Sequence, residues 1–281
     1  MKPAPFAYTK ARSLDEAIGL LGTRSEARLL AGGQSLLATL NMRLSAPRLL
    51  VDINGIPSLD RIDRKDGMLE IGALVRHAQA ERSRDIAEHA PLIALALPHI
   101  AHPAIRNRGT IGGSLAFADP AAELPACLLA LGGEVEIAGA KGKRTVKADD
   151  FFKGLFETAL GAQDVLSAIR IPAAAAQTRV GFAEFARRRG DYAIVGLAAS
   201  ARADGKGLAD VRLAYFGVGA TPIRAKKAED ALASGKLEEA IAALSSDLDP
   251  PDDIQATGKV KKHLAGVLLK RVALQLAEKR A

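Results

Sequence analysis

Two glycine pairs with hydroxyl neighbours are the residues of this 281-residue chain best suited to bind an anion. The first lies in Ala31-Gly32-Gly33-Gln34-Ser35 and the second in Thr110-Ile111-Gly112-Gly113-Ser114. Because glycine has no Cβ, such a turn can adopt a positive φ and bring its backbone N–H groups close to a phosphate. The serine or threonine can donate a further hydrogen bond, and a helix that starts there adds a favourable dipole. Two such turns predict a ligand with two linked phosphates, such as a dinucleotide.

Each glycine pair alone also fits an ordinary tight turn between strands. A third segment, Gly217-Val218-Gly219-Ala220-Thr221-Pro222, competes as a dinucleotide motif. It departs from the Rossmann pattern because Pro222 replaces the final glycine and no acidic strand end follows in a β-α-β unit. The sequence therefore favours a tight turn there, with Pro222 opening a helix, and disfavours a nicotinamide-binding Rossmann domain.

The first glycine turn must be held by the elements on either side of it. Residues 13–16 have the spacing of a capping box and open a helix that we expect Gly22 to close. A strand at 27–30 leads into the turn, leucines at helical spacing follow over 36–44, and 49–53 forms another strand. The segment up to about residue 55 therefore predicts a small β-α-β-α-β unit.

The second glycine turn lies in a longer, mixed region. Before it we expect strands at 59–62 and 68–72 and helices at 77–82 and 91–100. After it, Asp119-Pro120 is a good helix opening, because Asp can cap while Pro fits the first helical position, and that helix should run to residue 131. The segments 134–138 and 143–147 predict a hairpin, and a strand at 165–171 should stop at Pro172.

The alanine-rich segment 173–177 is the expected seam between two domains. We predict a domain at 1–172, with subdomains of about 1–55 and 56–172, and a C-terminal domain at 178–281. In the second domain, strands at 182–185, 196–203 and 208–217 precede helices that start near 225, 237 and 257. Strands followed by helices favour an α+β fold with an antiparallel sheet.

Composition narrows the classes of function. The net charge is +7, but aromatic residues make up only 4% of the chain, tryptophan is absent and the basic residues are scattered, which argues against a nucleic-acid partner. Arg106 and Arg108 precede the second turn and could add positive potential near a pyrophosphate. No stretch approaches the roughly 20 apolar residues of a membrane span, and residues 1–10 lack a signal core, so we expect no transmembrane segment and a cytoplasmic location.

The single cysteine, Cys127, lies in an apolar run and predicts a buried thiol. One cysteine cannot form an internal disulfide, a thiolate zinc site or an iron–sulfur cluster, and we expect no metal site in this chain. Redox chemistry would therefore need an organic cofactor.

Several segments in order resemble one known family. The two glycine turns, together with 105–109, 118–123, 189–193 and 217–224, are similar to the FAD-binding medium subunit of molybdenum-containing hydroxylases. That family includes the flavoprotein subunits of aerobic carbon monoxide dehydrogenase and of xanthine dehydrogenase-type enzymes. The resemblance covers nearly the whole chain and implies a two-subdomain FAD-binding domain of the PCMH type, followed by a C-terminal α+β domain.

The resemblance implies roles for individual residues. The segments 31–35 and 110–114 would bind the FAD pyrophosphate. Glu123, and with it Asp119, would accept hydrogen bonds from ribose or ribityl hydroxyls. Tyr192 would lie beside the isoalloxazine ring and Leu160 would pack near the flavin. The alternatives are a helix cap for Asp119, a surface helix position for Glu123, a plain strand aromatic for Tyr192 and a core position for Leu160.

Two positions depart from the family pattern. Carbon monoxide dehydrogenases carry a histidine where this chain has Gln34, and several members carry a lysine near the flavin where it has Glu184. A carboxylate there would disfavour an anionic reduced flavin. Glu184 therefore either points away from the flavin or shifts its potential.

The sequence offers no recognisable molybdenum-pterin site, no cluster cysteines and no acid–base pair, so we predict no catalytic residue of its own. By resemblance, a large molybdenum subunit hydroxylates the substrate, a small subunit with [2Fe-2S] clusters carries the electrons, and FAD in this chain passes them to NAD, a quinone or another acceptor. The alternatives are a stand-alone nicotinamide-dependent dehydrogenase and a non-catalytic docking subunit. Three histidines, His77, His99 and His102, have no assigned role.

Overall fold

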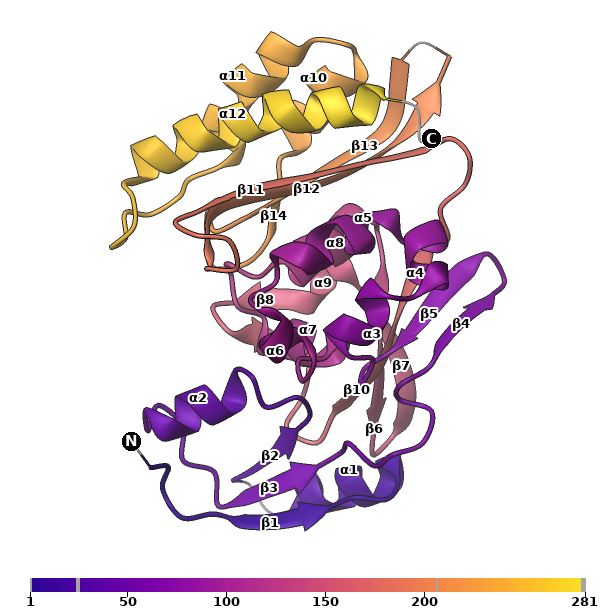
Figure 1. Ribbon diagram of the computed structural model, residues 1–281, viewed down its shortest axis with the longest axis vertical. Helices are drawn as coiled ribbons and strands as arrows, with labels where there is room; N and C mark the ends of the chain where they lie inside the picture. The colour runs from indigo at the N-terminus through magenta and orange to yellow at the C-terminus, as the bar shows by residue number, and fades with distance from the viewer. Residues whose placement is uncertain (1, 24–25, 206, 279–281) are drawn as a thin grey trace.

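The chain folds into three stacked units, as the computed structural model shows for residues 2–23, 26–205 and 207–278 (Figure 1). Each unit has its own cluster of buried apolar side chains. The N-terminal unit lies at the bottom of Figure 1, the middle unit carries most of the helices, and the C-terminal unit lies at the top. This arrangement confirms the α+β class.

The N-terminal unit is the predicted β-α-β-α-β segment. Its elements are β1 (Ala7–Lys10), α1 (Leu14–Thr23), β2 (Ala27–Leu30), α2 (Leu36–Asn41) and β3 (Leu49–Asp52). The strands are parallel in the order β1-β3-β2. Half of the predicted capping box forms, because Glu16 N donates to Ser13 Oγ, whereas the Glu16 carboxylate accepts from Arg12 N and not from Ser13 N. Two helix ends differ from the prediction, since α1 runs one residue beyond Gly22 and α2 ends before the left-handed Arg43.

The middle unit surrounds a five-stranded antiparallel sheet of order β4-β5-β10-β6-β7. Its strands are β4 (Ile62–Lys65), β5 (Met68–Gly72), β6 (Glu134–Gly139), β7 (Gly142–Lys147) and β10 (Val165–Pro172), with a small hairpin of β8 (Phe152–Gly154) and β9 (Glu157–Thr158). Its helices are α3 (His77–Glu81), α4 (Arg84–His89), α5 (Pro91–Ala96), the 3-10 turn η1 (Leu97–His99), α6 (Pro103–Arg106), α7 (Ile111–Phe117), α8 (Glu123–Ala130) and α9 (Ala148–Phe151). The predicted strand at 68–72 and the hairpin at 134–147 are confirmed.

Two predicted elements of the middle unit are wrong in position. The strand expected at 59–62 starts at Ile62, because Leu59 is buried in the N-terminal core and its carbonyl accepts from Leu74 N. The helix expected from Asp119-Pro120 starts at Glu123. Asp119 instead accepts from Ala121 N at 2.9 Å within a tight turn, which uses the oxygen that would have capped the helix.

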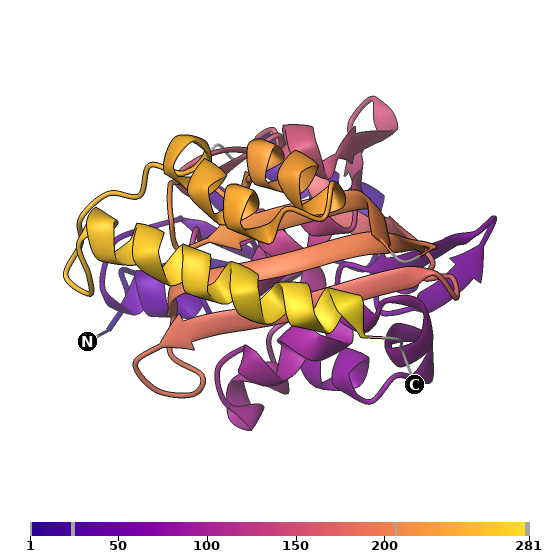
Figure 2. The same cartoon turned by 90° about the horizontal axis from the view of Figure 1, so that it is seen from above.

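The C-terminal unit is a four-stranded antiparallel sheet covered by three helices. Its strands are β11 (Thr178–Ala186), β12 (Ala193–Asp204), β13 (Gly207–Phe216) and β14 (Ile223–Arg224), in that order. Its helices α10 (Lys226–Ala233), α11 (Leu237–Asp247) and α12 (Gly258–Ala277) lie together on the outer face of the sheet (Figure 2). Pro222 precedes β14 and not a helix, so that part of the prediction is wrong. Gly217 adopts φ +74° in a turn between antiparallel strands, which rules out a Rossmann unit at this segment.

Both faces of this sheet are buried, which fixes the C-terminal unit on the middle one. Along β12, Val195, Leu197 and Ala199 pack under the outer helices, while Ala198 faces the core of the middle unit. This alternation follows from the two-residue period of a strand.

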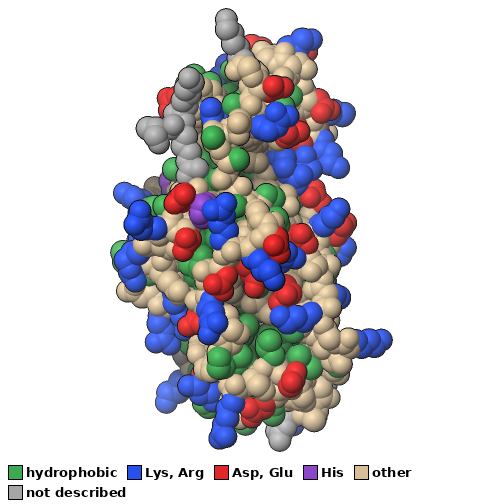
Figure 3. All heavy atoms as spheres, turned by 90° about the vertical axis from the view of Figure 1, so that its right-hand side faces the viewer, with side chains coloured by type: hydrophobic (Ala, Val, Ile, Leu, Met, Phe, Trp, Pro, Cys, Tyr) green, Lys and Arg blue, Asp and Glu red, His purple; other side chains and the backbone are tan. Residues whose placement is uncertain are grey.

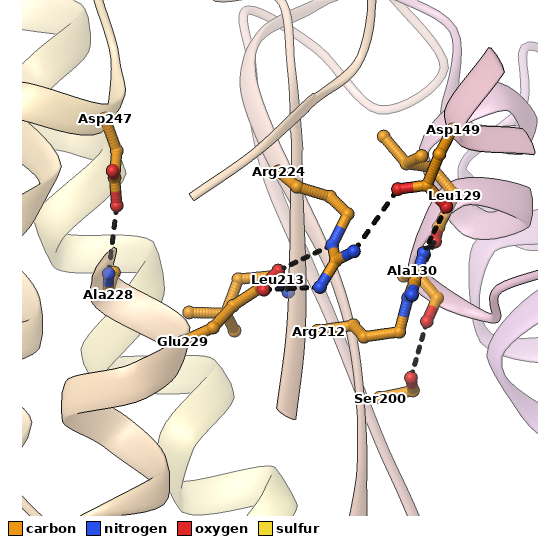
Figure 4. A network of polar contacts seen from close by, with 10 residues as sticks. All are labelled: Leu129, Ala130, Asp149, Ser200, Arg212, Leu213, Arg224, Ala228, Glu229 and Asp247. Carbon is orange, nitrogen blue, oxygen red and sulfur yellow. Dashed lines mark hydrogen bonds and ion pairs between the residues drawn. The ribbon is translucent and has the colours of Figure 1, made fainter. Parts of the chain in front are cut away.

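Polar contacts at the edge of the sheet add to the junction between the two units (Figure 4). Arg212 donates to Asp149 at 2.8 Å and to the Leu129 carbonyl, and Arg224 bridges Asp149 and Glu229. Ser200 Oγ donates to the Ala130 carbonyl at 2.6 Å. The C-terminal unit is therefore held against α8 and α9 by directional bonds as well as by apolar packing.

Candidate functional site

The first glycine turn presents a run of free backbone donors. Gly33 adopts φ +75°, and Ser35 occupies the N-cap position of α2. Within the described part of the chain, the N–H groups of residues 32–35 make no hydrogen bond. Consecutive free N–H groups beside a left-handed residue form a concave site for an anionic oxygen. The Gln34 side chain folds back and donates to the Gly32 carbonyl at 3.2 Å, so it stiffens the turn.

The second glycine turn differs from the expectation of bare N–H groups. Ile111 N donates to the Val75 carbonyl and Gly112 N to the Ala73 carbonyl, both at 2.9 Å. Gly113 N donates to Thr110 Oγ1 at 3.0 Å. A Cβ on Gly112 would overlap Ala73, so glycine here allows the backbone of α7 to pack closely against its neighbour. The expectation is wrong for these donors, and the half-buried Ser114 hydroxyl lies 3.1 Å from His77 Nε2.

The two turns meet at the seam between the N-terminal and middle units. A Cβ on Gly32 would overlap the Arg108 carbonyl, just before the second turn. Segments almost 80 positions apart in the chain thus form one continuous strip of backbone. A ligand that spans both segments is consistent with this contact.

Arg106 does not serve the turn as predicted. It is buried, and its guanidinium donates to Glu81 and to the carbonyls of Ile100 and Ala101. Its charge is therefore paired inside the middle unit. Arg108 is exposed, so only this second arginine is free to add positive potential beside the turn.

Three of the predicted site residues gather where α8 begins. Glu123 is buried, and burial raises the pKa of its carboxyl to about 8, with Glu184 and Asp119 as neighbouring carboxylates that add to the effect. Tyr192 lies near the same acids. Partial burial and the charges of Asp119 and Glu123 therefore raise the pKa of its phenol. The alternatives of a surface position for Glu123 and a helix cap for Asp119 are thus wrong.

Tyr192 and Leu160 occupy different surroundings. Tyr192 is 62% exposed and lies just before β12, so its ring is available to a ligand. Leu160 is half-buried against the core of the middle unit.

Glu184 points into the protein toward this acidic group. Its side chain is 5% exposed, and Oε1 lies 3.1 Å from His99 Nδ1. Oε2 is buried and has no hydrogen-bond partner among the described residues. His99 comes from the end of η1 and Glu184 from β11, and no local pattern in the sequence could have paired them.

Three further residues near the turns were missed as site residues. Asn54 and Arg76 lie beside the first turn and His77 beside the second. His77 is buried, and burial lowers the pKa of its imidazole to about 4, so the ring is neutral at physiological pH. The only sequence signal for Asn54 was its place just after the strand predicted at 49–53.

Charge is mixed on one face of the molecule. On the face shown in Figure 3, Lys and Arg side chains alternate with Asp and Glu, and the basic residues form no stripe. Among the described residues, no group of three or more His, Cys, Asp and Glu could hold a metal ion. No described helix is long and apolar enough to cross a membrane.

Two known protein families together match most of the chain. The family described as FAD binding domain in molybdopterin dehydrogenase matches residues 4–174, and the CO dehydrogenase flavoprotein C-terminal domain matches residues 181–276. The chain is 37% identical to the nicotine 6-hydroxylase medium subunit of Paenarthrobacter nicotinovorans, over 98% of both proteins. It is 34% identical to the carbon monoxide dehydrogenase medium chain of Hydrogenophaga pseudoflava, over 96% of both.

Solved structures extend the likeness to three dimensions. Carbon monoxide dehydrogenase from Hydrogenophaga pseudoflava superposes with a TM-score of 0.97 at 36% identity, over 100% of both chains. Quinoline 2-oxidoreductase from Pseudomonas putida 86 gives a TM-score of 0.93 at 38% identity, over 99% of this chain and 98% of the other. The predicted resemblance and the predicted cofactor are confirmed, and this chain belongs to the family of FAD-binding medium subunits of molybdenum hydroxylases.

Proposed function

We propose that this chain is the electron-relay subunit of a hetero-oligomeric molybdenum hydroxylase. Electrons would arrive from the [2Fe-2S] clusters of a small partner subunit, after hydroxylation of the substrate in a large molybdenum subunit. They would leave to NAD, a quinone or another acceptor. Bound FAD supplies the ability to exchange one or two electrons at a time, which the side chains of this chain lack.

The residues present fit that cofactor. The free N–H groups of residues 32–35 would hold the pyrophosphate, with the Ser114 hydroxyl of the second turn as a further donor. Glu123 and Asp119 would accept from the sugar hydroxyls, and the exposed ring of Tyr192 would cover the flavin. The observation that carries the proposal is the run of four N–H donors at residues 32–35, because no described residue accepts a hydrogen bond from them.

The pyrophosphate contact can be tested by charge at Gly33. Its φ of +75° favours glycine, but Asn and Asp tolerate this region best among other residues. Gly33→Asn and Gly33→Asp therefore impose the same shape and differ in charge. We expect Gly33→Asp to bind FAD at least about 100-fold more weakly than Gly33→Asn, since the carboxylate repels the pyrophosphate. Equal FAD affinity in the two variants, measured by flavin fluorescence after reconstitution, would refute this assignment.

The electron route needs the assembled complex. The full chain should co-purify with a large molybdenum subunit and a small iron–sulfur subunit. After reduction with dithionite, the complex is mixed with NAD⁺ or a soluble quinone, and the flavin absorbance reports which one accepts the electrons. Stoichiometric FAD without iron–sulfur partners would contradict the relay as proposed, and a flavin that neither NAD⁺ nor the quinone reoxidises would exclude both of these as the acceptor.

A further inference from the structure

Arg76 bridges the seam between the N-terminal and middle units, close to both glycine turns. Arg76 lies in the middle unit at the N-terminal end of α3. Its guanidinium donates to the carbonyl of Arg108, which precedes the second turn, and to Asn54 Oδ1 at 2.5 Å in the N-terminal unit. The planar guanidinium can hold two acceptors at a fixed separation, which a single ammonium nitrogen cannot. Arg76 therefore sets the distance between the two units where the turns meet.

Asn54 passes that constraint to the first turn. Its Nδ2 donates to the Ala31 carbonyl at 2.8 Å and to Asp52 Oδ1 at 2.7 Å. Asp52 is held in turn by the Tyr8 hydroxyl at 2.5 Å. Because both acceptors face the amide nitrogen and the guanidinium faces the amide oxygen, the orientation of the side chain is fixed. The carbonyl that Asn54 holds belongs to the first residue of the glycine turn.

The first turn packs tightly against the backbone at Arg108. Gly32 packs on the same Arg108 carbonyl that Arg76 grips, with no room for a Cβ. Moving Arg108 would thus move the wall against which the first turn rests. Half-burial and the charge of Arg108 lower the pKa of Arg76, so this cation is kept in an unfavourable place. Its two oxygen acceptors offset that cost.

We propose that Arg76 and Asn54 are positioning residues that hold the two glycine turns at the separation which a pyrophosphate requires. This inference rests on the proposed binding of the pyrophosphate at residues 32–35. Neither residue needs to touch the ligand. Each acts through the backbone carbonyl that it holds, and the two act as one unit because they share a hydrogen bond.

The test uses the full chain and three ligands. ADP carries the pyrophosphate, riboflavin carries only the flavin, and FAD carries both. The variants are Arg76→Ala, Asn54→Ala and the double variant, with the exposed Arg82→Ala as the matched control for lost charge. We expect each single variant to weaken the binding of ADP and FAD by about 10-fold or more, with the affinity for riboflavin unchanged and only a small fall in Tm. The double variant should lose little beyond either single one.

A direct contact between Arg76 and the phosphates gives a different pattern. It predicts additive losses in the double variant and substantial recovery in Arg76→Lys, which keeps the charge. The positioning role predicts coupled losses in the double variant and little recovery of ADP affinity in Arg76→Lys. Additive losses, recovery with lysine, a parallel fall in riboflavin affinity, or unchanged ADP affinity would each overturn the proposal. Gly33→Asp, measured beside these variants, separates the positioning role from the proposed pyrophosphate site. If Gly33→Asp still binds ADP, the assignment of the pyrophosphate to residues 32–35 is wrong. If Gly33→Asp is the one variant that loses ADP binding, the positioning role of Arg76 and Asn54 is wrong and the site is retained.

Discussion

Glu123→Gln should make the protein more stable at alkaline pH. The Glu123 carboxyl has its ordinary pKa of 4.5 in the unfolded chain, and burial raises the pKa to about 8 in the folded one. Between these values the unfolded state releases a proton that the folded state keeps. The free energy of unfolding therefore falls as pH rises through this window.

The magnitude follows from the width of the window. At about 1.4 kcal/mol per pH unit, the native protein loses up to about 5 kcal/mol of stability between pH 4.5 and 8. Glutamine has nearly the same shape and no proton to lose, so the variant avoids the loss. We expect the two proteins to be within about 1 kcal/mol of each other near pH 5, and the variant to be more stable by several kcal/mol at pH 9.

Urea denaturation of the FAD-free chain at several pH values measures this difference. Glu238→Gln is the matched control, because Glu238 also lies in the first turn of a helix but is 79% exposed. Its stability should follow that of the parent protein at every pH. Parallel curves for Glu123→Gln and the parent between pH 5 and 9 would refute the reasoning that a buried, protonated Glu123 lies at the start of α8.

Three further predictions concern the glycine seam and the C-terminal unit. Gly32→Ala should lower the free energy of unfolding by about 1–3 kcal/mol, because its Cβ would overlap the Arg108 carbonyl. Gly19→Ala, on an open helix face, should raise the free energy of unfolding by about 0.5–1 kcal/mol. Thermal unfolding of both variants measures these changes, and a Gly32→Ala variant as stable as the parent would contradict the close contact. Tyr215→Phe removes the buried hydroxyl that donates to the Ala265 carbonyl at 3.1 Å and should cost about 1 kcal/mol in urea denaturation, so an unchanged midpoint would count against that bond. Asp149→Asn should lower the Tm at pH 7 and have less effect toward pH 3. Partial burial opposes ionisation, but Arg212 and Arg224 hold the pKa of Asp149 below its ordinary value, so the stability that the carboxylate contributes is present above that value and lost in acid. A difference in Tm that does not change with pH would argue against these ion pairs.

Local chemistry carried the sequence predictions that succeeded. The β-α-β-α-β unit, the hairpin at 134–147 and the left-handed Gly33 follow from capping residues, apolar period and the lack of a Cβ, which act over a few neighbours. The order of the motifs was enough to identify the family and its cofactor. The strand at 59–62 and the helix at Asp119 failed because a distant core and a competing turn decided where those elements began.

By itself, the sequence predicted a ligand with two linked phosphates from its two glycine turns, and the order of its motifs established the family resemblance that implies FAD. Only the tertiary structure decided which donors stay free. In the second turn, Ile111 N and Gly112 N donate to the carbonyls of Val75 and Ala73, whereas the N–H groups of residues 32–35 have no acceptor among the described residues. The tertiary structure also places Glu184 beside His99 and buries Glu123. It pairs Arg106 with Glu81, away from the second turn, and brings the guanidinium of Arg76 to the Arg108 carbonyl. These outcomes depend on contacts between segments far apart in the chain, and residue type alone does not reveal whether a polar group meets a partner or remains available to a ligand.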